Sequence, residues 1–241
     1  VGVTLSVDEL RDTFDATCIA IGSTKARELD VPGSELDGIH LAMDYLPQQN
    51  KINAGELIDP HTRITAEGKR VIILGGGDTG ADCVGTAHRQ GADVVHQLEL
   101  LPKPHDTREP HNPWPQWPLI LRTSAAHEEG GIRDYSILTK GFSGGRSGHV
   151  EKLHAIQLEW GQPDASGRPT MSEIPGSELE IKTELVLLAM GFLHPEHEGM
   201  VADLSVQLDG RGNIKVDQNR MTSIPGVFAA GDAARGQSLV V

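Results

Sequence analysis

The stretch VIILGGGDTGAD, from Val71 to Asp82, decides the fold of this chain. Its four apolar residues predict a buried strand, and Gly75, Gly77 and Gly80 follow in the spacing G-x-G-x-x-G. In such a turn the first glycine permits a tight bend, the second lets a pyrophosphate approach the backbone, and the third lets a helix pack on the strand. Phosphates then lie at the helix N-terminus, where free N–H groups and the helix dipole favour anions.

The sequence after this turn favours a nucleotide site over a purely structural turn, which is the alternative. A helical pattern follows that Gly91 would end, and Asp93–Leu101 reads as the next strand. Glu99 stands at the end of that strand, about 20 residues after the turn, where an acid accepts hydrogen bonds from ribose hydroxyls. We predict a dinucleotide-binding turn, which also contains Gly76, Asp78 and Thr79.

The sequence leaves the choice between NAD and NADP open. A carboxylate at Glu99 would repel a 2′-phosphate and therefore favours NAD. Lys103 and Arg108 follow shortly afterwards and could instead receive a 2′-phosphate. An exposed glutamate at the end of a strand, without a ligand, is the alternative interpretation of Glu99.

Length and composition exclude several classes of protein. A chain of 241 residues forms one large domain or two small ones. Its net charge of -13 argues against a nucleic-acid partner, because phosphate binding requires clustered Lys and Arg. The longest apolar run, Leu185–Leu193, is far shorter than the roughly 20 residues of a transmembrane helix. We expect a cytoplasmic protein with neither a nucleic-acid nor a membrane partner.

Other candidate chemistry has less support. Cys18 and Cys83 lie among apolar or small residues without C-x-x-C spacing, so we expect buried thiols and no disulfide framework. His194 and His197 have H-x-x-H spacing, but no pattern of carboxylates or cysteines accompanies them, so we expect no metal site. The sequence has no G-x-S-x-G elbow from which a hydrolase triad could be built.

Two helices are predicted in the first 60 residues. Ser6 and Glu9 have the spacing of a capping box, which predicts a helix over Val7–Thr13. A second helical pattern covers Leu41–Asn50, where Pro47 should either kink the helix or mark its true start.

Several apolar segments read as strands, and three of them end on glycine, at Gly22, Gly191 and Gly231. Such glycines suit a backbone that approaches a ligand closely, although they are also common in simple turns. Connections rich in Gly and Pro separate the middle segments and predict a small antiparallel meander. The predicted strands are Asp15–Gly22, Tyr135–Phe142, Val150–Trp160, Glu178–Ile181, Glu184–Gly191 and Gly226–Asp232.

The segment Pro102–Pro118 contains six prolines and can be neither a regular helix nor a central strand. We expect an ordered loop or a lid. Trp114 and Trp117 in this loop could stack on a ring or anchor the loop to the surface.

Taken together, these motifs resemble the small (beta) subunit of glutamate synthase, a flavoprotein that oxidises NAD(P)H. The likeness covers nearly all 241 residues and is far more specific than any single motif. The front of the chain, AIGSTKARELDVPGSELDGIHLAMDYLPQQNK, resembles the stretch that precedes the nicotinamide fingerprint in that family. The other segments that carry the likeness are VIILGGGDTGADCVGTAHRQGA, QLELLPKP, NPWPQWP, SAAHEEGG, VLLAMGF and MTSIPGVFAAGDAARGQSLVV.

The resemblance implies an α/β fold in which a Rossmann-like NAD(P)H-binding domain is inserted in a partial FAD-binding domain. It places the partial FAD-binding domain at residues 1–60, the NAD(P)H-binding domain with its meander at residues 61–191, and the return to the FAD-binding domain at residues 192–241. Gly22, Gly191, Gly231 and Asp232 would then bind cofactor, with Asp232 near the FAD ribityl or pyrophosphate. Asp82 stands where relatives often have Glu, which puts a role for that acid in doubt.

The resemblance also implies a function. The intact protein would oxidise NAD(P)H through FAD and pass electrons to the large (alpha) subunit, which makes glutamate from 2-oxoglutarate and glutamine in ammonia assimilation. Hydride transfer between stacked cofactors mainly needs correct positioning, so we name no catalytic side chain. The first FAD fingerprint and the cysteine-rich region that holds iron–sulfur clusters in this family are not in the sequence. We therefore expect a fragment that is inactive on its own.

Three alternatives share some of these motifs. A related electron-transfer flavoprotein, such as part of a dihydropyrimidine dehydrogenase or a ferredoxin NADP reductase partner subunit, would differ in its electron acceptor. The segment NPWPQWP favours glutamate synthase over these relatives. A non-catalytic nucleotide-binding or subunit-docking module is a second alternative. A methyltransferase that binds S-adenosylmethionine is a third, but the terminal GVFAAGD has no place in it.

Overall fold

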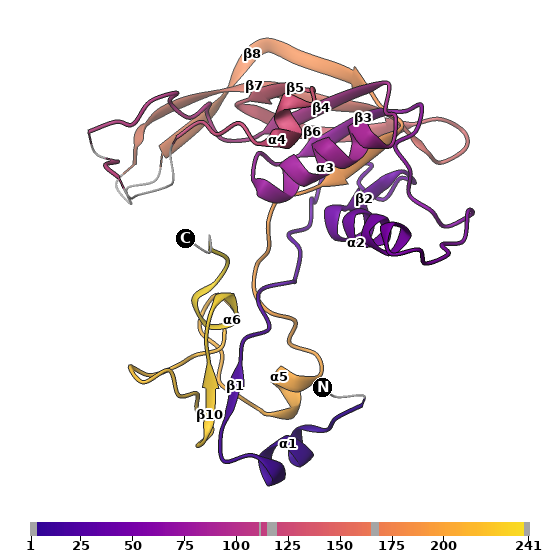
Figure 1. Ribbon diagram of the computed structural model, residues 1–241. Helices are drawn as coiled ribbons and strands as arrows, with labels where there is room; N and C mark the ends of the chain where they lie inside the picture. Colours follow the sequence, from indigo (N-terminus) through magenta and orange to yellow (C-terminus); the bar gives the residue numbers. More distant parts are fainter. Residues whose placement is uncertain (1–3, 111, 115–119, 165–168, 239–241) are drawn as a thin grey trace. The chain divides into compact units, whose positions relative to one another are not determined.

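The computed structural model describes residues 4–110, 112–114, 120–164 and 169–238 (Figure 1). The chain divides into two compact units. The terminal unit consists of Val1–Arg27 and Gly191–Val241, and the central unit consists of Glu28–Met190. The chain therefore leaves the terminal unit once and later returns to it, which is the course expected of an inserted domain.

The central unit is built on a five-stranded sheet in the order β2-β9-β3-β4-β5. Every neighbouring pair in this sheet is parallel. The predicted strand VIIL is β3, and it lies in the middle of the sheet between β9 and β4. The strands, in this order, are β2 (Ile39–Leu41), β9 (Leu185–Leu188), β3 (Arg70–Leu74), β4 (Val94–Glu99) and β5 (Ile132–Tyr135).

Two layers cover the parallel sheet (Figure 1). Helices α2 (Ala42–Asn53) and α3 (Asp78–Arg89) pack on one face, and the short helix α4 (Ala125–Glu128) lies against α3. An antiparallel sheet in the order β6-β7-β8 packs on the other face. The predicted meander is therefore confirmed, with strands β6 (Ile137–Gly144), β7 (Val150–Pro163) and β8 (Pro169–Lys182).

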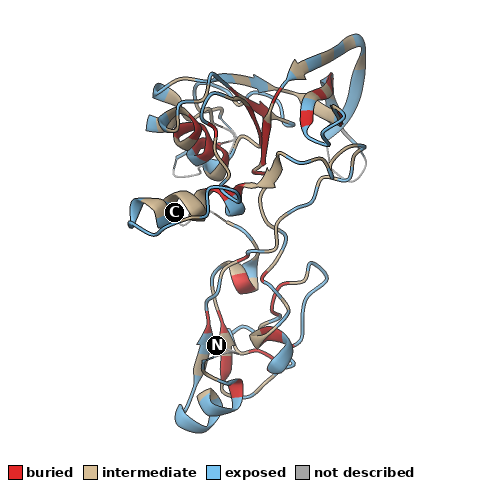
Figure 2. Ribbon diagram, turned by 90° about the vertical axis from the view of Figure 1, so that its right-hand side faces the viewer, coloured by how far each residue is buried: buried red, intermediate tan, exposed pale blue. Residues whose placement is uncertain are grey.

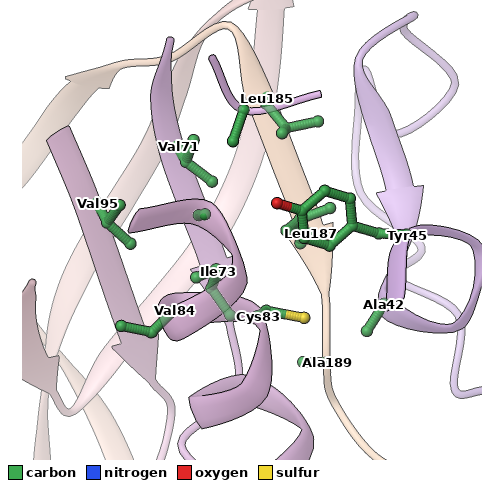
Figure 3. Close-up of a cluster of buried hydrophobic side chains, with 12 residues drawn as sticks. Ala42, Tyr45, Val71, Ile73, Cys83, Val84, Val95, Leu185, Leu187 and Ala189 are labelled. Atoms are coloured by element: carbon green, nitrogen blue, oxygen red, sulfur yellow. The ribbon is translucent and has the colours of Figure 1, made fainter. Parts of the chain in front are cut away.

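The alternation of side chains along β3 explains why this strand is apolar throughout. Val71 and Ile73 point to the helix face, where they join a buried cluster with Cys83 of α3 (Figure 3). Ile72 and Leu74 point to the other face and pack against the antiparallel sheet. Because both faces are covered, each of these side chains contributes about 1.5–3 kcal/mol by burial.

The terminal unit contains a two-stranded parallel sheet of β1 and β10. The capping box predicted at Ser6 is confirmed in its backbone bond, because the Glu9 amide donates to Ser6 Oγ at 3.1 Å. A separate apolar cluster, which includes Ile19, Ile214 and Ala229, stabilises this unit. Its elements are α1 (Val7–Thr13), β1 (Thr17–Ile19), α5 (Met200–Asp203), β10 (Val227–Ala229) and α6 (Asp232–Arg235).

The structure corrects two expectations about the front of the chain, a buried Cys18 and a helix that starts at Pro47. Cys18 is exposed: among the described residues β1 pairs with β10 alone, and Ile19 of β1, not Cys18, joins the apolar cluster of this unit. Pro47 lies inside α2, which begins at Ala42, so the proline neither starts nor ends the helix. The packing of α2 on the sheet, with Tyr45 fully buried, compensates for the hydrogen bond that the proline cannot donate.

The central unit starts earlier than the boundary expected at residue 61. Strand β2 pairs with β9, with Ile39 opposite Val186, so the segment before the glycine turn supplies an edge of the same sheet. The sequence also reads one strand where the structure has two, because Ser136, with a φ of 59°, separates β5 from β6. Strand β8 extends well beyond the predicted Glu178–Ile181.

The terminal unit and the central unit each have their own buried residues. In the central unit buried residues lie along α2, α3 and strands of both sheets (Figure 2). Among the residues that the structure describes, no helix has both the length and the apolar character needed to cross a bilayer.

Candidate functional site

The glycine turn follows β3 at the carboxyl edge of the parallel sheet. The Gly75 amide donates to the Leu98 carbonyl at 2.9 Å, and Gly75 has a φ of 125°, which other residues rarely adopt. A Cβ at Gly75 would also collide with the carbonyl oxygen of Ala189, just after β9. The ends of β3 and β9 therefore meet at Gly75.

This meeting point is the place where the order of strands reverses. From β3 the chain proceeds through α3 to β4 and β5 on one side, whereas β9 lies on the other side of β3. Ligands of open α/β sheets bind at such a switch point, outside the carboxyl ends of the strands.

Glu99, at the end of β4, holds the turn through its carboxylate. Its Oε2 accepts a hydrogen bond from the Gly76 amide at 2.6 Å, and its Oε1 accepts one from the Leu101 amide at 3.0 Å. A Cβ at Gly76 would lie 2.5 Å from Oε2, so a side chain there would displace the Glu99 carboxylate. The sequence places Glu99 near a ribose, and the structure brings it directly to the turn.

The start of α3 is open to a ligand. Gly77 is the N-cap of α3, no side chain caps the helix, and a Cβ at Gly77 would meet no protein atom within 4 Å. The first-turn amides at Asp78 and Thr79 have no acceptor within the helix, as at any helix N-terminus. The Asp78 carboxylate lies 3.8 Å from the Arg122 guanidinium. These open amides fit a pyrophosphate.

Gly80 has a sharper role than helix packing alone. A Cβ at Gly80 would collide with the Gly75 carbonyl oxygen and would lie 2.7 Å from Gln97 Nε2. Gln97 of β4 donates from Nε2 to this same carbonyl at 2.9 Å. The third glycine therefore leaves room for a side-chain hydrogen bond to the first one, which the spacing alone does not reveal.

The loop after β4 lies beside the carboxyl edge and is only partly described. Lys103 is 3.6 Å from Asp106, and Arg108 donates to the Asn112 carbonyl at 3.4 Å, so both cations have local partners. Trp114 is 80% exposed. Trp117 lies outside the described residues, as do the other residues from 115 to 118 of the segment NPWPQWP.

The terminal unit places its own glycines at the carboxyl ends of β1 and β10. Gly22 and Gly231 have φ values of 75° and 64°, and a Cβ at either would meet nothing within 4 Å. Ser23 Oγ donates to the Asp232 carbonyl at 3.0 Å, and Ser238 Oγ donates to its carboxylate at 3.0 Å. These open backbone segments beside Asp232 could accommodate part of a second nucleotide.

Gly191 is the first residue of the returning segment of the terminal unit. Unlike Gly22 and Gly231, it faces another side chain. It has a φ of 82°, and a Cβ there would lie 2.7 Å from Gln237 Oε1. The same Oε1 accepts a hydrogen bond from the Phe192 amide at 2.7 Å. A contact within the protein therefore accounts for this glycine.

The other residues considered in the sequence analysis have contacts within the protein or face solvent. The rings of His194 and His197 stack with centroids 4.1 Å apart, and each ring bonds a backbone carbonyl. Cys83 is buried in the cluster under α3, which raises the pKa of its thiol to about 12. Asp82 is exposed on α3. In the described part of the chain, no group of three His, Cys, Asp or Glu could hold a metal ion.

The sequence of this chain is similar to those of known oxidoreductases. The sequence pattern of the pyridine nucleotide-disulphide oxidoreductases matches residues 2–112 and 160–241. The glutamate synthase [NADPH] small chain of Mycobacterium tuberculosis is 48% identical over the whole of this chain, which covers 49% of that relative. The glutamate synthase [NADH] of Schizosaccharomyces pombe is 43% identical over 98% of the chain, which covers 12% of that relative. The chain spans about half the length of the mycobacterial small chain.

A solved structure shows the same fold. FprA from Mycobacterium tuberculosis, in complex with NADPH, superposes with a TM-score of 0.70 at 18% identity. The superposition covers 100% of this chain and 62% of FprA. The two units, the open parallel sheet with its glycine turn and the match over both ends of the sequence agree with one another. This chain belongs to the pyridine nucleotide-disulphide oxidoreductase family.

Proposed function

We propose that the central unit binds a nicotinamide dinucleotide at the turn Gly75–Gly80. The observation that carries this proposal is the open N-terminus of α3, where Gly77 has free space and the first-turn amides have no acceptor within the helix. The position at the switch point of the sheet and the family match support it.

Within this proposal each residue of the turn has a separate task. Gly77 lets the pyrophosphate approach the backbone, and the amides of Asp78 and Thr79 donate to its oxygens. Glu99 accepts from a ribose hydroxyl with lone pairs that its two backbone contacts leave available, since a carboxylate has about four acceptor sites. Gly75 and Gly76 keep the backbone close to β9 and to Glu99.

We further propose that the terminal unit contributes part of an FAD site at Gly22, Gly231 and Asp232. Open space beside both glycines and the carboxylate held by Ser238 support this assignment. With both cofactors bound, the nicotinamide supplies a hydride that reduces the flavin. The residues of this chain bind and orient the cofactors, and none of them needs to exchange a proton.

We infer that the whole protein is the small subunit of a cytoplasmic glutamate synthase. It would oxidise NAD(P)H, pass electrons through FAD and iron–sulfur clusters, and deliver them to a large subunit for glutamate synthesis from 2-oxoglutarate and glutamine. The 48% identity to a glutamate synthase small chain supports this inference. The two cysteines of the chain, Cys18 and Cys83, lack the close C-x-x-C spacing of a redox pair.

Nucleotide binding is tested by titrating the purified chain with NADH and with NADPH while recording nucleotide fluorescence and the visible spectrum. We expect binding of at least one nucleotide, little flavin absorbance, and no reduction of an added acceptor. The substitution Gly77→Val should weaken binding more than tenfold, because its side chain fills the space of the pyrophosphate.

A matched control is available for this substitution. Gly210, in the terminal unit, also has open space around its missing Cβ and no positive φ, so Gly210→Val should leave both nucleotide binding and the melting temperature unchanged. Because Gly77 has a φ of -80° and open space, Gly77→Val should lower the melting temperature only by the loss of a favoured N-cap residue. Unchanged affinity in Gly77→Val would mean that the turn is only structural.

A further inference from the structure

Gln97 is a buried polar residue whose side-chain nitrogen and oxygen both have hydrogen-bond partners. It is 2% exposed and lies on the same face of β4 as Val95, toward α3. Its Nε2 donates to the Gly75 carbonyl at 2.9 Å. Its Oε1 lies 2.9 Å from Nε2 of His127, on α4. A hydrogen-bonded chain therefore runs from α4 through β4 to the first glycine of the turn.

The Ser124 amide indicates the direction of the hydrogen bonds between His127, Gln97 and Gly75. The Ser124 amide can only donate, and it bonds His127 Nδ1 at 3.2 Å, so Nδ1 is the acceptor. The ring proton is therefore on Nε2, which donates to Gln97 Oε1. This donation fixes the orientation of the Gln97 amide, whose NH₂ group must then face the Gly75 carbonyl.

The turn is built to receive this contact. A side chain at Gly80 would occupy the space where Gln97 Nε2 meets the Gly75 carbonyl. The Gly75 carbonyl belongs to the peptide unit that carries the Gly76 amide, so holding this oxygen also sets the direction of the amide. The hydrogen-bonded chain thus acts on the backbone beside the proposed pyrophosphate position.

His127 lies in a segment that the family pattern does not match. The family pattern matches residues 2–112 and 160–241, so α4 lies in the segment that it does not match. Helix α4 packs against α3, and the Arg89 guanidinium forms an ion pair with Glu129 across this contact. The intervening segment therefore reaches back to the nucleotide turn through a defined side chain.

We propose that Gln97 and His127 are positioning residues of the nucleotide site, which hold the Gly75–Gly76 peptide in the orientation that a bound dinucleotide requires. This inference rests on the proposed function of the turn. Neither side chain touches the ligand in this arrangement, because both act through the Gly75 carbonyl. Without the His127 contact the Gln97 amide is free to rotate. In the rotated orientation Oε1 of Gln97 faces the Gly75 carbonyl oxygen, and the two oxygens repel each other.

Two substitutions of His127 separate positioning from local stability. In His127→Gln, Nε2 of the new amide follows the same bonded path as the ring Nε2 and can still donate to Gln97, but the acceptor for the Ser124 amide is lost. In His127→Asn, Oδ1 replaces the Nδ1 acceptor and keeps the cap of α4, but the donor to Gln97 is lost. We measure the Kd for NADH and NADPH and the melting temperature of the full chain at pH 8.

We expect His127→Asn and Gln97→Leu to weaken nucleotide binding about fivefold, the effect of one hydrogen bond, while His127→Gln stays within about twofold of wild type. The melting temperature should follow the other order, with His127→Gln below His127→Asn, because only the former loses the cap. Affinity that follows the melting temperature, or that is equal in all variants, would overturn the proposal.

A measurement on the unmutated chain makes the test independent of folding in the variants. Nitrogen-15 NMR of the histidine rings should show His127 with its proton on Nε2 and an unprotonated Nδ1 at pH 8. A proton on Nδ1 would overturn the inference whatever the nucleotide does. If the wild-type chain binds neither nucleotide, the proposed function fails and the positioning role fails with it, whereas normal binding with unaffected variants removes the positioning role alone.

Discussion

The carboxylate of Glu99 has an observed contact with the turn, which the sequence does not suggest, beside the proposed contact with a ribose. It accepts from the Gly76 amide, which orders the turn, and it carries the charge that would face a 2′-phosphate. Substitution by glutamine keeps one acceptor, because the amide oxygen still accepts from Gly76, but it removes the negative charge and the acceptor of the Leu101 amide.

We predict that Glu99→Gln raises affinity for NADPH relative to NADH by about five- to tenfold. Two like charges 4 Å apart repel by about 1 kcal/mol in water and by more in a partly buried site. The measurement is the ratio of the two Kd values. Glu67→Gln, at an exposed acid in the turn before β3, is the control and should leave this ratio unchanged. An unaltered ratio in Glu99→Gln would place the ribose elsewhere.

Protonation of His127 should make the stability of the chain depend on pH. Burial, and secondarily the nearby Arg133, lowers the pKa of His127 below its ordinary value of 6.5. The unfolded chain therefore binds a proton at a higher pH than the folded chain does. Stability falls as the pH decreases from about 6.5 through the lowered pKa, and it is fully retained above 6.5.

We predict that His127→Gln loses less stability than wild type between pH 8 and pH 5.5 in urea denaturation. Part of the slope should remain, because burial also lowers the pKa of His40. The other titratable or charged groups around α4 are His88 and Arg89 of α3, Arg133 of β5, and Glu128 and Glu129. Equal pH slopes in the two proteins would mean that His127 takes up its proton equally in both states.

At the scale of elements, the junction between β3 and β9 should be intolerant of any side chain. Gly75→Ala places a Cβ against the backbone of Ala189 at a φ of 125°. Gly91 also has a positive φ, 84°, but open space around it. Gly91→Ala therefore measures the cost of conformation alone, about 1 kcal/mol.

We predict that Gly75→Ala lowers the free energy of unfolding by about 3 kcal/mol or more, since the collision with a backbone atom adds to the conformational cost. Urea denaturation of Gly75→Ala, Gly91→Ala and wild type makes the comparison. Equal costs for the two alanines would mean that the ends of β3 and β9 separate easily.

The elements most accurately predicted are those with local signals. Strand β3, helix α3 and strand β4 follow from an apolar run, a glycine turn and a glycine at the helix end, all within about 30 residues. Strands β2 and β5 have no such local signal, because their place at the edges of the sheet depends on partners far along the chain. Pro47 misled for the same reason, since packing on the sheet outweighs its local preference.

The glycines of the candidate site and Glu99 could be predicted from the sequence, but the side chains that hold the turn in place could not. Residues Gly75, Gly77 and Gly80 belong to a short motif whose spacing has a physical cause. Gln97 and His127 are 30 residues apart, and neither type of residue indicates a buried contact from sequence alone. The exposure of Cys18 was also unpredictable, because its apolar neighbours do not reveal how many strands flank β1.

At the scale of the whole molecule, each unit has its own apolar core. Both clusters of the central unit, on either face of its parallel sheet, are formed by residues between Glu28 and Met190. All strands of its two sheets fall within the same limits. The central unit therefore contains what a cooperative domain needs.

We predict that a chain of residues 28–190 unfolds cooperatively in urea and binds the same nucleotide as the full chain, with a Kd within about twofold. A chain of residues 61–191, cut at the boundary expected from sequence, lacks β2 and α2 and exposes one edge of β9 together with the cluster around Tyr45. It should aggregate or unfold at lower urea concentrations. Equal stability of the two pieces would show that residues 28–60 contribute little.

The order of strands has a consequence for the growing chain on the ribosome. Strand β3 appears early, but its partner β9 is the last strand of the sheet to be made, and within the described residues β2 pairs with β9 alone. At 5–20 residues per second, synthesis of the segment between Leu74 and Leu188 takes roughly 6–23 s. During this interval the apolar strand VIIL has at least one unpaired edge, which favours pairing with other chains until Leu188 emerges.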